Sequence, residues 1–453
     1  MKPWSCLLVA AVVSTSLPAA SQTLQDTLVK AYNSNPTLRA ARAALRSTDE
    51  GVPQALSNWR PTVKLSSYGE WNVSDSTTTG AARVGDVTYP RAGSVAVSEN
   101  VYRGGRTSAA VAGAESDVKA GRASLAATEQ TVLVNAATAY ADVVRDQAVL
   151  DLNINNERVL QRQLEATQDR FRVGEVTRTD VSQAESRLAL ARAERTSAEG
   201  SLADSRATYK NVVGEDPPVL KPAEPLGDLP ANLGDTVTQA EEKNYTVQRA
   251  HYVEESARHN VDEITGELGP TVNLSGSVLT NAEVSTQYSK NTEAAVTLTV
   301  SLPLYSSGSV SSRVRAAKQV VGQRRDEYNQ AVRNAIQSAT SAWQLLETAR
   351  AQVRAFTAGV NAAQIALEGV REEANVGSRT VLDVLNAEQE LLTQRVGLVR
   401  AQHDVLVGTF QVRQAVGNLT AMSLKLPVDQ YDPTKHYKEV RDKWWGLEAS
   451  DGR

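Results

Sequence analysis

Residues 170–191 read RFRVGEVTRTDVSQAESRLALA, and a related stretch, EANVGSRTVLDVLNAEQELLTQ, spans residues 373–394. The Val-Gly pair at 173–174 recurs at 376–377, an offset of 203 residues, and an Asp and an Ala-Glu pair follow at the same offset. In both copies the Val-Gly pair interrupts a long run of helix-favouring residues. Glycine tolerates the positive φ at which a helix can end. The two stretches therefore predict two helical hairpins, each turning at its Val-Gly pair.

The duplication extends over most of the chain. The segments VYRGGRTSAAV and LYSSGSVSSRV share the offset of 203, which matches Tyr102 to Tyr305. Upstream, RPTVKLSSYG and GPTVNLSGSV match at an offset of 209. The halves meet in a stretch rich in Pro and Gly, residues 214–235, which is typical of a linker. We predict a first repeat at 22–214, a linker at 215–234, a second repeat at 235–417 and a periplasmic C-terminal tail at 418–453.

The N-terminus has the pattern of an export signal. A Lys, an apolar run from Cys6 to about Leu17 and small residues at 19–21 follow one another in the order of a signal peptide. A buried N-terminal helix is the alternative, although the run is too short to span a bilayer. Cys6 is the only cysteine of the chain. With residues 1–21 removed as a signal peptide, we expect neither disulfides nor a thiolate site.

Composition argues against several classes of function. The net charge is −4 without a concentrated basic face, which gives no reason to expect nucleic acid as a partner. The four histidines lack metal-ligand spacing, and we find neither a GxSxG elbow nor a phosphate loop. We expect no enzyme activity, no cofactor and no metal site. After the signal, no segment is apolar over the roughly 18 residues that a membrane helix needs, so entry into a membrane would use β-structure.

Each half contains a predicted pair of strands, at 61–102 and 270–305. Between residues 294 and 302, apolar residues alternate with small and polar ones, which is the period of a sheet with one apolar face. The same alternation begins at Val63. An ordinary soluble hairpin is the alternative. The stretch VSDSTTTGAARVGDVT, residues 73–88, is long and polar, as is typical of an extracellular loop of an outer-membrane protein.

Helical segments surround each strand pair. We expect a short helix before it, at about 24–58 and about 235–267, and two long helices after it, at 106–172 with 179–213 and at 309–375 with 380–416. Apolar residues at steps of three and four along the long helices predict coiled-coil seams. The last helix carries two such seams, which indicates packing neighbours on both of its sides.

The duplication, the VGxxT turns ending at Thr177 and Thr380, and the segment SRTVLDVLNAEQELL resemble the TolC family of outer-membrane efflux and type I secretion channels. The resemblance implies an α+β membrane protein with two homologous halves. Four strands per chain would contribute to a trimeric 12-stranded β-barrel, and long antiparallel helices would form a periplasmic α-barrel. The strand count agrees with several copies, because four strands are too few to close a barrel and known membrane barrels start at about eight.

The implied function is that of an outer-membrane channel-tunnel that exports small molecules or proteins, as the exit duct of a tripartite efflux or type I secretion system. Its partners would be two further copies of the chain in a homotrimer, a periplasmic adaptor (membrane fusion protein), an inner-membrane pump and outer-membrane lipid. The protein would lie in the outer membrane of a Gram-negative bacterium, with its helices extending into the periplasm. A periplasmic coiled-coil adaptor or scaffold is the alternative, since long helical hairpins alone would suit it.

The resemblance also implies two sets of functional residues at the ends of the hairpins. The docking tips for the adaptor would be Val173, Gly174, Thr177, Val376, Gly377 and Thr380. The periplasmic gate would consist of Thr179, Asp180, Arg379, Asp383 and Asn386. Arg379 would bond to Thr179 and Asp180 of a neighbouring hairpin and hold the entrance shut. Asp383 would line the opening as a ring, which Asn386 would weaken because relatives place a second acid there.

A simpler interpretation remains open for the same residues. Turn chemistry alone explains the glycines, and Thr179 and Asp180 are good capping types at the start of a helix.

Overall fold

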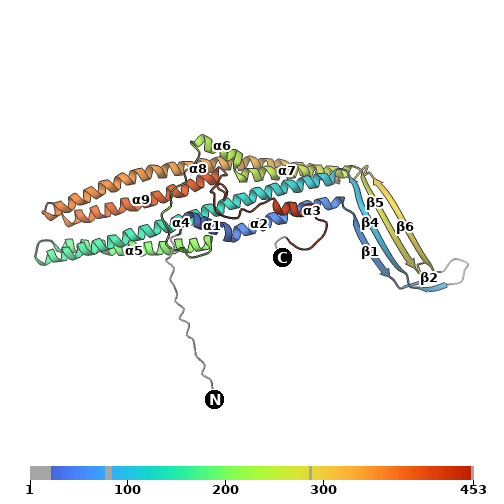
Figure 1. The fold of residues 1–453 in the computed structure, drawn as a ribbon, viewed down its shortest axis with the longest axis horizontal. Coiled ribbons are helices and arrows are strands. Elements are labelled where there is room, and N and C mark those ends of the chain that lie inside the picture. Colours follow the sequence, from blue (N-terminus) through green and yellow to red (C-terminus); the bar gives the residue numbers. More distant parts are fainter. Residues whose placement is uncertain (1–21, 77–83, 285–287, 450–453) are drawn as a thin grey trace, which may run out of the picture. The chain divides into compact units, whose positions relative to one another are not determined.

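The computed structural model describes residues 22–76, 84–284 and 288–449 (Figure 1). The predicted signal peptide and the centre of the predicted extracellular loop, residues 77–83, lie outside this part. The chain divides into two compact units, each assembled from three separate parts of the sequence. The tip unit comprises the residues up to 38 together with 129–239 and 338–430, and the strand unit comprises 39–128, 240–337 and the residues from 431 onward.

The strand unit contains a four-stranded antiparallel sheet in the order β1-β4-β5-β6. Its strands are β1 (Thr62–Gly69), β4 (Arg91–Arg103), β5 (Thr271–Ala282) and β6 (Lys290–Ser301). A separate pair, β2 (Asn72–Ser76) and β3 (Val84–Thr88), follows β1 and precedes β4. Residues 73–76 and 84–88, at the two ends of the predicted extracellular loop, are therefore strand and not loop. The reason is that Val73 pairs with Val87 in the β2–β3 register, so backbone pairing continues through polar sequence.

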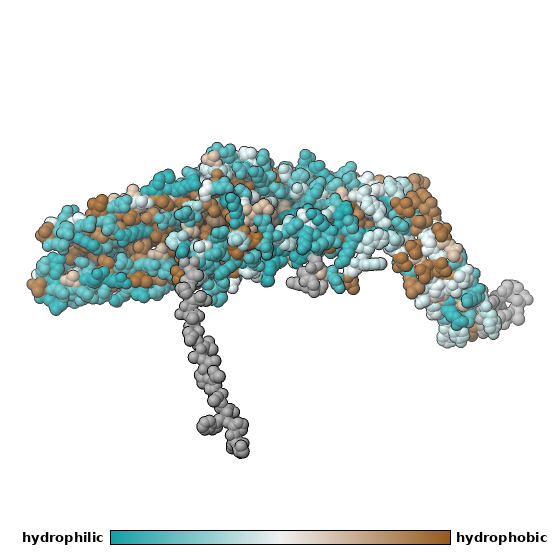
Figure 2. All heavy atoms as spheres, viewed as in Figure 1, coloured by the Kyte–Doolittle hydropathy of each residue, from teal (hydrophilic) through white to brown (hydrophobic). Residues whose placement is uncertain are grey.

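One face of the four-stranded sheet is apolar and exposed. The register places Val63 opposite Val97, Leu65 opposite Val95 and Leu274 opposite Leu298. These six side chains are between 40% and 80% exposed. The opposite face carries mainly polar side chains, among them Lys64, Ser66, Ser98, Asn273, Thr297 and Thr299. Figure 2 shows hydrophobic residues gathered over the strands. An apolar surface of this kind marks contact with lipid or with another chain.

Two long helical hairpins follow the strand pairs. Their helices are α4 (Arg106–Arg172) with α5 (Arg178–Val213), and α8 (Ser309–Asn375) with α9 (Val381–Ala415). The buried seam between α4 and α5 contains Tyr140, Val143, Leu202 and Tyr209, together with the small residues Ala139 and Ala198. Within the described ranges, none of the helices combines the length and the apolar character needed to cross a membrane.

Two asparagines divide the helices that precede the strands. The structure has α1 (Leu24–Ser34), α2 (Pro36–Asp49), α3 (Gly51–Leu56) and a 3-10 turn (Ser57–Trp59) in the first half, and α6 (Leu233–Lys243), α7 (Tyr245–Thr265) and a 3-10 turn (Gly266–Leu268) in the second. Each expected single helix is thus broken, at Asn35 and at Asn244, and the first is interrupted again at Glu50, between α2 and α3. The ψ values of the two asparagines are 122° and 124°, and each side chain accepts a hydrogen bond from an amide two residues later. Pro36 further disfavours a helical Asn35.

The Pro-rich linker between the halves lies against the tip unit. The Tyr140 hydroxyl donates to the carbonyl of Lys221 at 2.5 Å and to that of Gln22 at 3.2 Å. The Gln22 amide donates to the carbonyl of Val219 at 3.0 Å. Burial raises the pKa of Tyr140 to about 12, so this hydroxyl stays a hydrogen-bond donor. The linker is therefore irregular but held in place. A last short helix, α10 (Lys435–Val440), lies in the strand unit.

Candidate gate, docking tips and histidine bridge

Both helical hairpins turn through the same local structure. The glycine that follows the first helix has a positive φ, 79° at Gly174 and 82° at Gly377. In the first turn the Glu175 amide donates to the Arg170 carbonyl at 2.9 Å, and the equivalent bond of the second turn is also 2.9 Å. This six-to-one bond around a left-handed residue is the Schellman helix end, at which glycine avoids the steric cost of its Cβ.

A capping box starts each returning helix. The amide and the hydroxyl of Thr177 donate to the carboxylate of Asp180, both at 2.8 Å, and the Asp180 amide donates back to the hydroxyl at 3.3 Å. Thr380 and Asp383 form the same arrangement, with distances of 2.9, 2.8 and 3.3 Å. The capping interpretation is therefore corrected in one respect. Thr177 and not Thr179 caps α5, because the helix already begins at Arg178.

Asp383 is held in its anionic form by these bonds. Hydrogen bonds from the amide and the hydroxyl of Thr380 lower the pKa of Asp383, and the nearby guanidinium of Arg379 lowers it further. Arg379 itself donates from Nε to Glu373 of its own turn at 2.8 Å, and both side chains are 51% exposed. A pair this exposed contributes little to stability and exchanges partners easily. The bonds from Arg379 to Thr179 and Asp180 of a neighbouring hairpin stay a prediction.

The two hairpins pack against each other next to their turns. One buried cluster joins Leu160 and Leu164 of α4, Ala184, Leu188 and Ala191 of α5, and Val381 and Leu385 of α9. Arg187 of α5 also donates to the side-chain oxygen of Asn386 on α9 at 2.9 Å. Sequence reasoning treated Asn386 only as a missing acid. The structure gives it a partner on the other hairpin.

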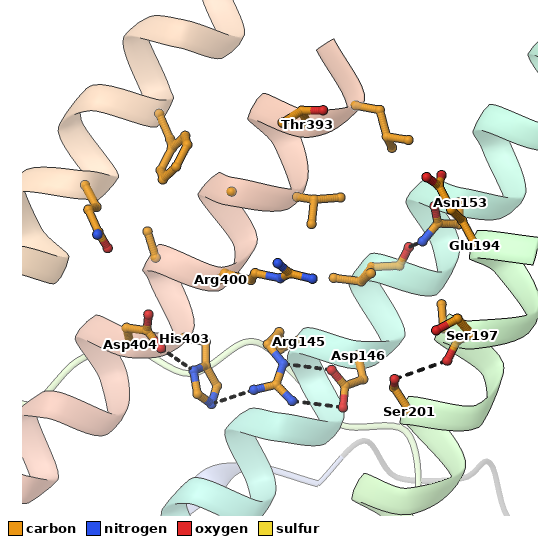
Figure 3. Close-up of a pocket in the computed structure, with 18 of the residues that line it drawn as sticks. Arg145, Asp146, Asn153, Glu194, Ser197, Ser201, Thr393, Arg400, His403 and Asp404 are labelled. Atoms are coloured by element: carbon orange, nitrogen blue, oxygen red, sulfur yellow. Dashed lines mark hydrogen bonds and ion pairs between the residues drawn. The ribbon is translucent and has the colours of Figure 1, made fainter. Parts of the chain in front are cut away.

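A group of charged residues that the sequence did not point to connects α4 with α9, and we call it the histidine bridge. Figure 3 shows four of its members, Arg145, Asp146, His403 and Asp404. His403 lies with Nε2 2.9 Å from Asp142 and with Nδ1 2.9 Å from Asp404. Arg145 donates to the same Asp142 at 2.7 Å and binds both oxygens of Asp146, at 2.7 and 3.0 Å. Two cationic groups and three carboxylates thus meet between the first and second hairpins.

His403 and Arg145 line two grooves of the tip unit. The larger has a volume of about 800 Å³ and is bounded by residues of α4, α5, α8 and α9. Figure 3 shows Arg400 reaching into it from α9, with Glu194 and Asn153 on its other side. The second groove, of about 540 Å³, is more apolar and is also lined by residues 222–225 of the linker.

The bridge favours a charged imidazole. Burial opposes the cation of His403, as does the guanidinium of Arg145, whose Nη1 lies 3.4 Å from Nε2. The hydrogen bonds to Asp142 and Asp404 outweigh both and raise the pKa of His403. Both ring nitrogens face a carboxylate, and only the protonated ring can donate from both. No motif could have revealed this group, because 261 residues separate Asp142 from His403. At the repeat offset, moreover, Asp142 corresponds to Leu345 and His403 to Gly200.

With this geometry in place, the chain can be compared with known proteins. The model of the outer membrane efflux protein family matches it twice, at residues 27–215 and 236–418. The chain belongs to the outer membrane efflux protein family. The outer membrane efflux protein BepC of Brucella suis biovar 1 (strain 1330) is 37% identical over 452 residues, which is 99% of this chain and 97% of BepC.

Two further comparisons, one of sequence and one of structure, agree with this family. The outer membrane protein TolC of Escherichia coli (strain K12) is 26% identical over 311 residues, 65% of this chain and 63% of TolC. The crystal structure of the Campylobacter jejuni CmeC outer membrane channel has a TM-score of 0.79 to this chain at 16% identity, covering 92% of this chain and 89% of CmeC. It shares the mostly helical fold.

Family membership confirms the predicted fold class, localisation and transport function. The protein is an outer-membrane channel of the TolC type whose helices extend into the periplasm. Members of this family are transport channels and not enzymes. The roles of the individual gate and tip residues stay predictions.

The raised pKa of His403 predicts how the stability of the fold depends on pH. A charged His403 stabilises the fold fully below the pKa of an unfolded histidine, about 6.5, and this contribution is lost as pH rises through the folded value. His403→Gln should therefore lower the midpoint of thermal unfolding most at about pH 5, and the difference from wild type should shrink toward about pH 9. The exposed His251→Gln serves as the control. A difference that stays constant with pH would contradict a charged bridge.

Proposed function

We propose that three copies of the chain form the outer-membrane exit duct of a tripartite export assembly. The observation that carries this proposal is the apolar, exposed face of the β1-β4-β5-β6 sheet. Such a face is stable only against lipid or another chain. A soluble adaptor or scaffold, the alternative from the sequence, has no use for it.

The two edge strands support the number of copies. Within the described sheet, β1 pairs only with β4 and β6 only with β5, so each has one unpaired edge. Neighbouring strands alternate in direction, and β6 of one copy can therefore continue into β1 of the next as an antiparallel pair. Two copies would supply eight strands, whose interior is filled by side chains. Three copies supply twelve strands and leave room for an aqueous duct.

The two faces of the sheet then have separate roles. The face with Val63, Leu65 and Leu298 contacts outer-membrane lipid, and the face with Lys64, Ser66 and Thr299 lines the water-filled interior. A wide polar duct discriminates little between solutes. The choice between small molecules and proteins accordingly belongs to the inner-membrane pump that delivers them.

The hairpin turns are the docking tips for a periplasmic adaptor. Val173 and Val376 precede the two glycines and are 79% and 80% exposed. Apolar side chains this open at two equivalent turns offer a repeated contact, present six times in a trimer. The neighbouring Thr177 and Thr380 keep the turns in one conformation through their capping boxes. A rigid, repeated tip suits an adaptor that binds around a ring.

Asp180, Asp383 and Arg379 form the gate next to these tips. Three copies of Asp383 would make an anionic ring at the entrance, and three copies of Arg379 would connect it to Thr179 and Asp180 of neighbouring hairpins. In the single chain, Arg379 forms an ion pair with an exposed glutamate of its own turn. Exchanging this glutamate for a residue of a neighbouring hairpin therefore costs little free energy. Such an exchange suits a gate that an adaptor can open.

The first prediction of this proposal concerns assembly. Purified protein should have the native mass of three chains in detergent, and chemical cross-linking should stop at the trimer, because the strand edges close at that number. Single-channel recordings of the same sample should show a conducting pore. A monodisperse monomer that still conducts ions would contradict the proposed duct.

The second prediction concerns the tips. Gly174→Val and Gly377→Val should abolish export while the trimer still reaches the outer membrane, because a β-branched residue at positive φ is strained by about 1–3 kcal/mol. An added Cβ meets nothing within 4 Å at either glycine, so backbone strain and the altered docking surface are the only effects. Gly174→Asn and Gly377→Asn are matched controls, since Asn tolerates this conformation, and they should retain export. Full export by both Val variants would refute the assignment.

The third prediction concerns the gate. Arg379→Ser should raise the resting conductance in planar bilayers, and Asp180→Ala should do the same because it removes the other partner. Asp383→Ala should reduce cation selectivity with little change in conductance, since a ring of charge attracts counter-ions.

Two control variants separate the gate from its local chemistry. Asp26→Ala removes a capping box of the same kind from α1 and should leave conductance unchanged. Glu373→Gln releases Arg379 from its own turn and should not open the channel. Two outcomes would refute the proposed bonds from Arg379 to the neighbouring hairpin. In one, Glu373→Gln raises the conductance as much as Arg379→Ser does; in the other, Arg379→Ser conducts like wild type.

A further inference from the structure

The last part of the C-terminal tail, from residue 431 onward, belongs to the strand unit, and neither the fold nor the proposed gate accounts for it. His436 of α10 lies 3.1 Å from Asp49, whose side chain is fully buried, and Val440 is 5% exposed. Tyr437 donates to Glu115 at 3.3 Å. Burial raises the pKa of Asp49, and the contact with His436 acts against this rise. These contacts place the end of α10 at one defined position.

After α10 and three charged residues, Arg441 to Lys443, the chain carries exposed apolar side chains. Trp444, Trp445 and Leu447 are 66%, 89% and 104% exposed. This is not a loose end, because Arg60 donates to the Lys443 carbonyl at 2.6 Å and its guanidinium lies 5.1 Å from the centre of the Trp444 ring. The Trp444 side chain is therefore held in place although it is largely exposed, and Trp445 beside it is more exposed still.

Trp444 lies next to the start of the sheet. Arg60 stands two residues before β1 begins at Thr62, and Trp59, itself 44% exposed, precedes it. The apolar face of β1 begins next to them, with Val63 at 69% exposure. We call the exposed side chains of Trp59, Trp444, Trp445 and Leu447 the aromatic tail patch. They belong to two segments that Arg60 joins, through Lys443 and Trp444, next to the start of the sheet.

Two cations that suit phosphate, Arg60 and Lys443, stand at the patch, and two exposed carboxylates, Asp442 and Glu448, lie in the same segment. Among the described residues, no carboxylate lies within ion-pair distance of Arg60 or Lys443, although both stand beside the tryptophans. Tryptophan, with an apolar ring and a polar N–H, concentrates where hydrocarbon meets headgroups, and Arg and Lys bind phosphate oxygens there. A sheet that enters a bilayer passes the headgroup layer at its start, so the position of Arg60 and Trp444 beside β1 favours lipid over a soluble protein partner.

We propose that the aromatic tail patch binds the phospholipid headgroup layer of the periplasmic leaflet and anchors the C-terminal tail to the membrane surface. This inference rests on the proposed insertion of the sheet and goes beyond it. The contact fixes the depth at which β1 enters the bilayer.

The test uses the full chain in vesicles of phosphatidylethanolamine and phosphatidylglycerol. Because Cys6 is the only native cysteine and lies in the predicted export signal, Ala449→Cys provides a single site for an environment-sensitive fluorophore. Lipids brominated near the headgroup or deep in the chains report its depth by quenching. Leu298→Cys on the apolar sheet face and Ser186→Cys on the exposed surface of α5 are the membrane and water controls.

We expect headgroup-proximal bromine to quench the label at Ala449→Cys, deep bromine to quench that at Leu298→Cys, and neither to quench that at Ser186→Cys. Adding Trp444→Ser and Trp445→Ser should reduce quenching at Ala449→Cys by about twofold or more. A label at Ala449→Cys that behaves like Ser186→Cys, while Leu298→Cys is quenched, overturns the anchor alone. Quenching that persists without both tryptophans does the same. An unquenched Leu298→Cys overturns insertion of the sheet, and the anchor falls with it.

Discussion

The apolar face of the β1-β4-β5-β6 sheet, left open by its own chain, is the constraint on which the rest of the structure depends. Burial of apolar surface is the main force that stabilises a fold, yet Val63, Leu65 and Leu298 remain exposed. The unpaired edges of β1 and β6 add backbone groups that need partners in the membrane. Lipid and further copies of the chain can satisfy both needs, so the strand unit is complete only in the assembled channel.

Duplication explains how one chain supplies both hairpins, and it also shows where they differ. The two turns repeat down to individual hydrogen bonds, because the left-handed glycine and the capping box are specified by a few adjacent residues. The histidine bridge has no counterpart, since Leu345 and Gly200 occupy the equivalent positions. The shared features are the ones that any helical hairpin needs at its turn. The unique one joins the first hairpin to the second, a contact that neither half could make with a copy of itself.

Local chemistry therefore decides what the sequence can predict here. The long helices and the positions of both turns could be read from periodicity, Val-Gly pairs and threonines, because these act within a few residues. The breaks at Asn35 and Asn244 were missed, although the pattern of Asn before Pro36 was present in the first half. The extension of strand into residues 73–76 and 84–88 depends on pairing across the hairpin. The contacts of His403 with Asp142 and of Arg187 with Asn386 join separate hairpins, and no spacing encodes them.

The geometry of the capping boxes changes how the gate residues should be viewed. From the sequence, capping and gating are rival explanations of Asp180 and Asp383. In both boxes, however, the bonds from the capping threonine go to Oδ2 of the aspartate. The cap thus orients the carboxylate and keeps Asp383 ionised, while Oδ1 is not required for it. One oxygen can hold the helix start and the other can face a cation or a neighbouring arginine. In the proposed gate, capping would thus fix the position of a surface charge, so the two roles are compatible and not rivals.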